Sequence, residues 1–312
     1  MEALYGVGGY YTTMTAWDAA YGGATGADLV ANDENVVLDC YNDFGAALVD
    51  NFLTYSFTAT DATRNVTIKV PTSERHNGTF GSGFELQANQ YAAYHVFPAY
   101  TDITGFAFDN LNVGGNGVHI GKECIARGVL VKAARGSKLD ADRTAGDSAS
   151  AENSMFVSTQ ANYWALSLGG YSYANRILRN VNCLNTANPL RGCDLQNRGY
   201  VTIENCYASG WVESGATHTS VRNNASDVGA STAPPGTSPL EVNIVAGDFV
   251  DAANGDYHLA PGSQLIGEGV DLSAYFTTDI DGETRGVPWD IGYDQRVSAG
   301  SGPTLLLALV PA

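Results

Sequence analysis

Ile203-Glu204-Asn205-Cys206 and Val221-Arg222-Asn223-Asn224 have the same order of residues: an apolar one, a charged one and then asparagine. Phe108-Asp109-Asn110-Leu111 repeats this order, and Asn180-Val181-Asn182-Cys183 is a looser copy. The asparagines at 182, 205 and 223 follow one another in steps of 23 and 18 residues, at or just under the short end of known solenoid periods. The repeat indicates a chain that stacks similar turns on one another.

The asparagines of this repeat are expected to occupy equivalent turns. Asn205 and Asn223 would stack as a ladder in which each side-chain amide bonds to the next turn. The alternative is a chance match, because asparagine is common here and the shared motif is short.

Short strand-like runs, separated by Gly, Asn, Asp or Pro, fill residues 35–132. No helical pattern of about 10–15 residues lies between them, which excludes βαβ units. The runs are Val36–Leu38, Phe52–Tyr55, Val66–Val70, Phe84–Leu86, Phe106–Phe108, Val118–Ile120 and Val129–Val131. The sequence therefore predicts an all-β parallel β-helix, a solenoid. Its inward-facing residues are expected to include Val66, Ile68, Phe106, Phe108, Ile203 and Val221.

The regions outside these runs suggest how the chain is organised. A short helix is expected over Thr15–Tyr21, with Thr15 as N-cap, Asp18 completing a capping box and Trp17 as an apolar anchor that plugs the core. The charged and polar stretch Ala133–Asn153 suggests a projecting loop. The expected parts are a cap (1–34), the β-helix turns (35–230), a linker (231–239), a closing module (240–297) and a hinge with an apolar tail (298–312).

Composition and charge exclude several partners. The net charge of −17 and the pI near 4.4 repel nucleic acids and anionic lipids, so neither a nucleic acid nor a membrane is expected as partner. Five irregularly spaced cysteines do not form a disulfide framework and are expected to be buried free thiols. No basic segment followed by an apolar one comes after Met1, so we expect synthesis in the cytoplasm without a secretory signal.

A series of short motifs occurs near the C-terminus. It comprises Asp248–Asp251, Gly255–Leu259 (GDYHL), Pro261–Ser263, Gly267, Gly269, Asp279–Gly282 (DIDG), Arg285 and Asp290–Gly292 (DIG). The series resembles the closing segment of right-handed β-helix proteins of the pectate-lyase-like superfamily. This resemblance implies a right-handed β-helix and says little about function.

Four N-terminal pieces add a second resemblance: Tyr10–Thr13 with Trp17, Ala59–Ala62, Val66–Ile68 and Arg75–Gly78. Together they are similar to a variant of this superfamily that is common in phage proteins of unassigned role. The resemblance implies a protein associated with a virion. The two resemblances cover most of residues 1–120 and 248–294.

Enzymes of the superfamily suggest where chemistry would lie. Its lyases use a basic residue together with acidic Ca²⁺ ligands, and its hydrolases use paired carboxylates. The candidates here are Lys138, Asp140 and Asp142, with Arg143, Asp147 and Glu152 nearby. Asp140 and Asp142 alternate on an extended strand and would face the same way, to bind Ca²⁺ or to act as acid and base. The competing interpretation, which we favour, is a solvated loop held by local ion pairs.

Other candidate groups favour structural roles. Asp109 and Arg127, like Glu204 and Arg222, are 18 residues apart and predict cross-turn ion pairs rather than a catalytic dyad. The turn Asp279–Gly282 begins like a calcium-binding EF-hand loop, but its twelfth position is Asp290 rather than Glu, so a closing turn is expected. His76 and His119 are isolated and are expected to be structural. No P-loop, GxSxG or HExxH motif is present.

Three functions remain open. The favoured one is a structural component of a tailed-phage virion, made in the host cytoplasm: a capsid decoration, head-fibre or tail-spike subunit. Its expected partners are other virion proteins, further copies of the chain and host glycans. The alternatives are a polysaccharide-cleaving β-helix enzyme and a non-catalytic carbohydrate-binding adhesin.

The last residues form an apolar tail. Large apolar side chains crowd a run of seven residues after the glycine-rich stretch 299–302: Leu305, Leu306, Leu307, Leu309 and Val310. Such a run tends to pair or to be buried. We expect it to anchor the chain to a neighbouring subunit, and the alternative is a cap folded over its own C-terminal turn.

Overall fold

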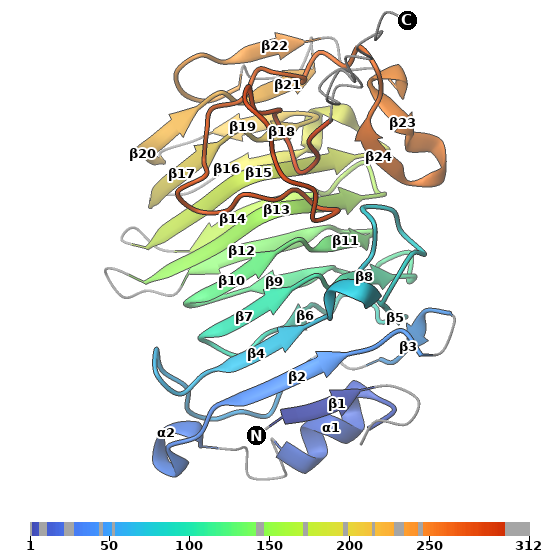
Figure 1. Cartoon of the computed structure of the whole chain (residues 1–312), viewed down its shortest axis with the longest axis vertical. Helices are drawn as coiled ribbons and strands as arrows, with labels where there is room; N and C mark the ends of the chain where they lie inside the picture. Colours follow the sequence, from blue (N-terminus) through green and yellow to red (C-terminus); the bar gives the residue numbers. More distant parts are fainter. Residues whose placement is uncertain are drawn as a thin grey trace, which may run out of the picture.

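Parallel strand pairing dominates the computed structural model of this protein (Figure 1). The structure describes residues 2–5, 11–21, 28–43, 46–51, 54–141, 147–170, 174–195, 199–213, 216–227, 234–242 and 246–296. Within these residues the large sheet has 16 strands: β1 (Glu2–Tyr5), β2 (Val36–Cys40), β3 (Leu48–Val49), β4 (Val66–Lys69), β5 (Glu85–Ala88), β7 (Thr101–Thr104), β8 (Ala107–Asn110), β10 (Cys124–Arg127), β11 (Leu130–Ala133), β13 (Ser148–Ser158), β15 (Asn175–Asn185), β17 (Tyr200–Glu204), β18 (Tyr207–Ala208), β20 (Thr217–Arg222), β21 (Ala225–Asp227) and β22 (Leu240–Val242).

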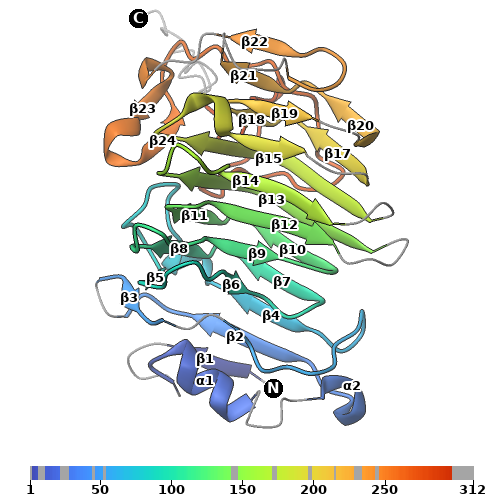
Figure 2. The same cartoon turned by 180° about the vertical axis from the view of Figure 1, so that it is seen from behind.

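A second parallel sheet lies on the other side of the core (Figure 2). Its six described strands are β6 (His95–Val96), β9 (Val118–Ile120), β12 (Ser137–Ala141), β14 (Leu166–Gly170), β16 (Cys193–Leu195) and β19 (Trp211–Glu213). The remaining elements are helices α1 (Met14–Tyr21) and α2 (Leu29–Asn32) and the antiparallel pair β23 (Phe249–Asp251) and β24 (Asp256–Leu259). The protein is thus mostly β, with long parallel sheets curled around its core.

Strand register builds the core as a column of buried side chains. Successive paired strands place one small or apolar residue directly above the last: Leu38, Ile68, Ile103, Ala126, Ala151, Leu178, Ile203 and Val221. Because a strand alternates its faces, the residues between them point away from this column. The predicted inward residues are all buried, and Ile203 pairs with Val221 on parallel strands as expected.

Left-handed residues mark the same bend in six successive turns of the chain, those that contain β7, β10, β13, β15, β17 and β20. Positive φ angles occur at Gly105, Gly128, Asn153, Asn180, Asn205 and Asn223. Only glycine, and to a lesser degree asparagine, adopts this conformation at low cost, which explains the residue type at these positions. The Asn205 amide donates to Asn180 Oδ1 at 3.3 Å, so an asparagine contact between neighbouring turns is present.

The prediction of the asparagine ladder was nevertheless partly wrong about which asparagines contact one another. Asn180, not Asn182, is the partner of Asn205, and the Asn223 amide donates to the Glu268 carbonyl instead of to Asn205. Asn110 belongs to a different bend, because β8 aligns through β11 and β13 with Asn185. A four-residue motif could not distinguish these two bends.

The N-terminal helix packs as predicted. Trp17 of α1 is fully buried and contacts the rings of Tyr55 and Phe57. The helix begins one residue earlier than expected, at Met14, and the Thr13 hydroxyl accepts from the Ala16 amide. The expected cap Thr15 instead bonds to Asp50.

Two other local predictions differ from the structure. Residues 133–153 are not a loop: β12 and the first half of β13 lie within them, and both continue the sheets. Of the predicted strand Phe52–Tyr55, residues 52–53 lie outside the described residues, and Thr54 forms an isolated bridge with Val96.

Residues 246–296, which we call the C-terminal strap, cover part of the outer face of the large sheet, where β8, β11, β13, β15, β18 and β21 lie (Figure 1). Side chains of the strap and of the sheet form a second apolar cluster. The sheet contributes Ala107, Leu130, Met155, Val157, Leu184, Tyr207 and Ala225, and the strap contributes Phe249, Tyr257, Leu259, Leu265, Ile280, Ile291 and Tyr293. Before the strap, β22 still pairs with β21, so the large sheet continues past the predicted linker.

Candidate functional site

The predicted catalytic cluster is only partly assembled. Lys138 and Asp140 lie on β12, half-buried, and their charged groups contact each other directly. Leu139, the residue between them, enters the core, so the pair faces outward from the six-stranded sheet. Asp142 and Arg143 lie outside the described residues. The expectation that Asp140 is a loop residue was wrong, because β12 pairs with β9 and β14.

The acids expected beside this pair have other partners. Asp147 lies 3.5 Å from the ammonium of Lys122. Glu152 binds Arg127 and Arg179 on neighbouring strands. The structure therefore does not bring Asp147 and Glu152 to Lys138 and Asp140.

His119 is the side chain that does approach the pair. Its Nε2 lies 3.9 Å from Asp140 Oδ2, and its backbone pairs in register with Lys138. Burial, together with the charge of Lys138, lowers the pKa of His119 against the opposing effect of Asp140. A neutral His119 could act as a base by accepting a proton. Asp140, however, is paired with Lys138 and is not available as an acid, so His119, Lys138 and Asp140 do not form an acid–base pair.

A charge ladder runs along the outer face of the large sheet. Arg127, Glu152, Arg179, Glu204 and Arg222 are register partners on successive strands. Each contact between neighbours has a nitrogen–oxygen distance of 2.9–3.1 Å. The predicted Glu204–Arg222 pair is confirmed.

The other predicted pair of this type was wrong. Arg127 binds Asp102 and Glu152, whereas Asp109 binds the Lys132 ammonium at 2.6 Å. The circuits near Asp109 are longer than 18 residues, since β8 pairs with β11 in a register of 23. A spacing that holds between β17 and β20 therefore fails there.

Glu204 shows that the ladder is structural. Burial alone would raise the pKa of Glu204, but hydrogen bonds from Ser220 and the two flanking arginines outweigh burial and lower this pKa. The Arg179 guanidinium also stacks on the ring of Tyr275, 3.5 Å from its centroid, which links the ladder to the strap. All these charges are paired, so the ladder offers no reactive group.

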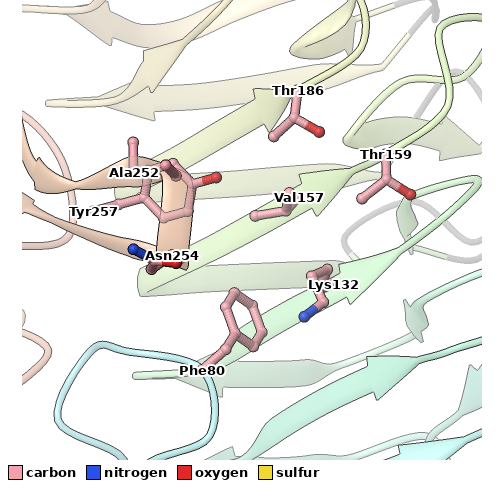
Figure 3. Close-up of a pocket in the computed structure, with 10 residues that line it drawn as sticks. Phe80, Lys132, Val157, Thr159, Thr186, Ala252, Asn254 and Tyr257 are labelled. Carbon is pink, nitrogen blue, oxygen red and sulfur yellow. The ribbon is translucent and has the colours of Figure 1, made fainter. Parts of the chain in front are cut away.

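A cavity of about 420 Å³ lies between the strap and the edge of the large sheet (Figure 3). Its lining combines two aromatic rings, one ammonium group, three hydroxyls and one side-chain amide. These belong to Phe80, Tyr257, Lys132, Thr159, Thr186 and Asn254. Sequence analysis did not identify this cavity, because its wall comes from five separate stretches of the chain.

Lys132 is the charged group of this cavity. Asp109 holds its ammonium at 2.6 Å, and the ammonium also lies 4.7 Å from the centroid of the Phe80 ring. Burial raises the pKa of Asp109 and outweighs the opposing effect of the Lys132 ammonium. Apolar rings beside hydroxyl, amide and ammonium donors suit a ligand that has both apolar faces and hydroxyl groups, as sugars do.

The cysteines, the turn Asp279–Gly282 and His76 have structural roles. All five cysteines are free and buried, as predicted, and burial raises the pKa of Cys124 to about 11. Asp279–Gly282 forms a tight turn, as predicted, in which Asp279 Oδ1 accepts from the amides of Asp281 and Glu283. His76 is buried and bonds through both ring nitrogens to backbone groups of Gly128 and Gly78.

The predicted anchor residues Leu305, Leu306, Leu307, Leu309 and Val310 lie outside the described residues. Among the residues that the structure describes, no helix combines the length and apolar character needed to cross a membrane. In comparisons with known proteins, no family model, no curated protein and no solved structure matches the chain.

Proposed function

We propose that this chain is a right-handed parallel β-helix of the pectate-lyase-like type and serves as a structural component of a phage virion, presented on the particle surface. The C-terminal resemblance supports the fold, and the N-terminal resemblance supports the phage assignment. The buried column from Leu38 to Val221 is the observation that carries the structural role. Such a stack gives a stiff body whose length grows with the number of turns.

Within this proposal the chain is not an enzyme. Lys138 and Asp140 neutralise each other, and the carboxylates of the charge ladder are held by arginines. A polysaccharide-cleaving enzyme would need an acid and a base free to face one bound sugar.

Two measurements test the proposal. Mass spectrometry and immunogold labelling of purified particles should find the chain on the virion surface. Incubation of the purified chain with host polysaccharide should release neither reducing ends nor unsaturated uronates. Absence from purified particles would contradict the virion role, and glycan cleavage would promote the depolymerase alternative.

A second candidate function is non-catalytic glycan binding, which the cavity of Figure 3 favours. Aromatic rings bind the apolar faces of sugars, and the hydroxyl, amide and ammonium groups of Thr159, Asn254 and Lys132 can bond to sugar hydroxyls. In this role the cavity would contact host glycans while the stacked strands carry it on the particle.

Glycan-array binding with matched variants tests this role. Phe80→Ala and Asn254→Ala should each weaken binding about tenfold, since each removes one lining group. Tyr91→Ala is the control, because Tyr91 is an exposed aromatic residue that does not line this cavity. Equal binding by all three variants would exclude the cavity as the glycan site.

A further inference from the structure

One imidazole and two carboxylates converge where the strap crosses the turn that follows Arg75. His258 lies on β24, Asp281 in the turn Asp279–Gly282, and Asp294 near the end of the strap. One potential metal-binding atom from each lies within 4.8 Å of the other two. Asp294 is buried, His258 is half-buried and Asp281 reaches solvent, so the group is open on one side.

A third acid, Asp256, fixes the orientation of the imidazole. Asp256 Oδ1 lies 2.5 Å from His258 Nδ1 and accepts its proton in a hydrogen bond. The opposite nitrogen, Nε2, then faces Asp281 Oδ1 at 3.1 Å. Histidines that bind metals commonly donate their other ring nitrogen to a carboxylate in this way.

The space beside these donor atoms is kept open by a glycine. Gly78 has φ of +80°, and a Cβ atom there would come within 2.3 Å of His258 Nε2 and 3.2 Å of Asp281 Oδ1. Any other residue at this position would therefore fill the volume next to both donors.

A buried hydroxyl without a partner lies beside the same group. Tyr293 is fully buried, and its hydroxyl has no hydrogen-bond partner among the described residues. Its ring centroid is 6.1 Å from that of His258. Burial raises the pKa of Tyr293, and the charges of Asp294, Asp256 and Asp281 raise it further. An unsatisfied buried donor of this kind calls for a further ligand or an ordered water.

We propose that His258, Asp281 and Asp294 bind a divalent transition-metal ion, with Zn²⁺ as the ion that fits the donor set. One imidazole and two carboxylates form a mixed nitrogen–oxygen set typical of Zn²⁺, with bonds of about 2.0–2.2 Å. The 3.1 Å between His258 Nε2 and Asp281 Oδ1 is close to the separation of two ligands on one ion. Water would complete the coordination on the exposed side, and the ion would tie β24 to the later part of the strap.

The test uses the full chain after treatment with a chelator. Calorimetric titration with ZnCl₂ should show one ion per chain, and saturation should raise the melting temperature. Titration with Co²⁺ should produce visible absorption bands of a nitrogen–oxygen site. Asp281→Asn and His258→Gln should each weaken Zn²⁺ binding by at least about tenfold.

Glu283→Gln is the matched control, because Glu283 is an exposed acid of the same turn that is not part of the group. It should bind Zn²⁺ like the unaltered chain. Asp281 is exposed, so its variant should have the circular dichroism spectrum of the unaltered chain and decides the question if His258→Gln is unstable. Absence of stoichiometric binding, full affinity in Asp281→Asn, or an equal loss in Glu283→Gln would overturn the proposal.

Discussion

Asp227 is a carboxylate whose environment disfavours its charge. Burial raises its pKa to about 6, with a smaller contribution from Asp248, even though the Tyr207 hydroxyl donates to it at 2.7 Å. The folded protein thus binds this proton more tightly than the unfolded chain, in which an aspartate has a pKa near 3.9. The stabilising contribution is complete below pH ~4 and is lost as the pH rises through about 6.

Asp227→Asn should therefore stabilise the protein at neutral pH. The amide stays neutral, and its oxygen still accepts from Tyr207. One pKa unit corresponds to about 1.4 kcal/mol, and part of the carboxylate faces solvent, so we expect a gain of roughly 1–2 kcal/mol at pH ~7 and none near pH ~4. Urea unfolding across this pH range measures the difference. Asp251→Asn, at an exposed site, is the control, and a gain independent of pH would contradict the assignment to Asp227.

Asp140 tests what the Lys138–Asp140 pair contributes. Asp140→Asn removes a half-buried ion pair on a strand rather than a charge on a loop. Such pairs contribute about 0.2–1 kcal/mol, so we expect a loss of this size in urea unfolding. Glycan binding and particle assembly should stay unchanged. Loss of a glycan-cleaving activity in this variant, with the fold intact, would instead identify Asp140 as catalytic.

At the scale of elements, sequence patterns predicted the positions of strands better than they predicted which segments lie beside one another. The predicted run Val66–Val70 contains β4 (Val66–Lys69), because the alternation of apolar and polar residues reflects local burial and is visible within a short stretch of sequence. The stretch 133–153 looked like a loop because its strands carry small and polar residues. Ala149 and Ala151 are nonetheless buried, since a column that already holds larger side chains needs small ones at these positions.

The sites were harder to predict, because their residues come from distant parts of the chain. Lys132 reaches Phe80 and Asp109 only because β11, β8 and the turn before β5 lie side by side. His258, Asp281 and Asp294 meet only because the strap folds back on itself. Short motifs contain no information on which distant residues meet in space. Because the turns of the chain differ in length, a fixed sequence spacing does not identify residues that lie on neighbouring strands.

Two variants at Asn205 can separate the contribution of its side-chain hydrogen bonds from that of its left-handed backbone conformation. Its φ is +54°, its amide donates to Val270 O at 2.7 Å, and its Oδ1 accepts from the Val270 amide at 2.8 Å. Asn205→Gly keeps the backbone conformation but loses these bonds, which should cost roughly 1–3 kcal/mol. Asn205→Ala adds the strain of a left-handed alanine, about 1 kcal/mol more. Equal stability of the two variants in thermal unfolding would show that the backbone conformation costs nothing there.

For the whole molecule, the strap is the segment that covers an apolar part of the large sheet. Leu130, Met155 and Tyr207 are almost completely buried beneath it. Ending the chain after Val242 would expose these side chains as one apolar patch, and soluble proteins rarely tolerate large patches of this kind. We expect this truncated chain to aggregate or to bind the dye ANS strongly. A chain ended after Arg296 retains the strap and is the control. Full solubility of the shorter chain without dye binding would show that the strap is dispensable.

The apolar tail leads to the last prediction, which concerns assembly. Residues 305–310 contain Leu305, Leu306, Leu307, Leu309 and Val310, and the strap already covers the large sheet without them. Burying such a run at about 25 cal/mol per Å² could contribute several kcal/mol to an association between subunits. Deleting residues 299–312 should therefore leave the circular dichroism spectrum and melting temperature unchanged. The same deletion should shift the chain to monomer in sedimentation experiments and abolish its incorporation into particles. If the shortened chain unfolds, the tail is a cap on its own subunit; if it assembles normally, the tail is not the anchor.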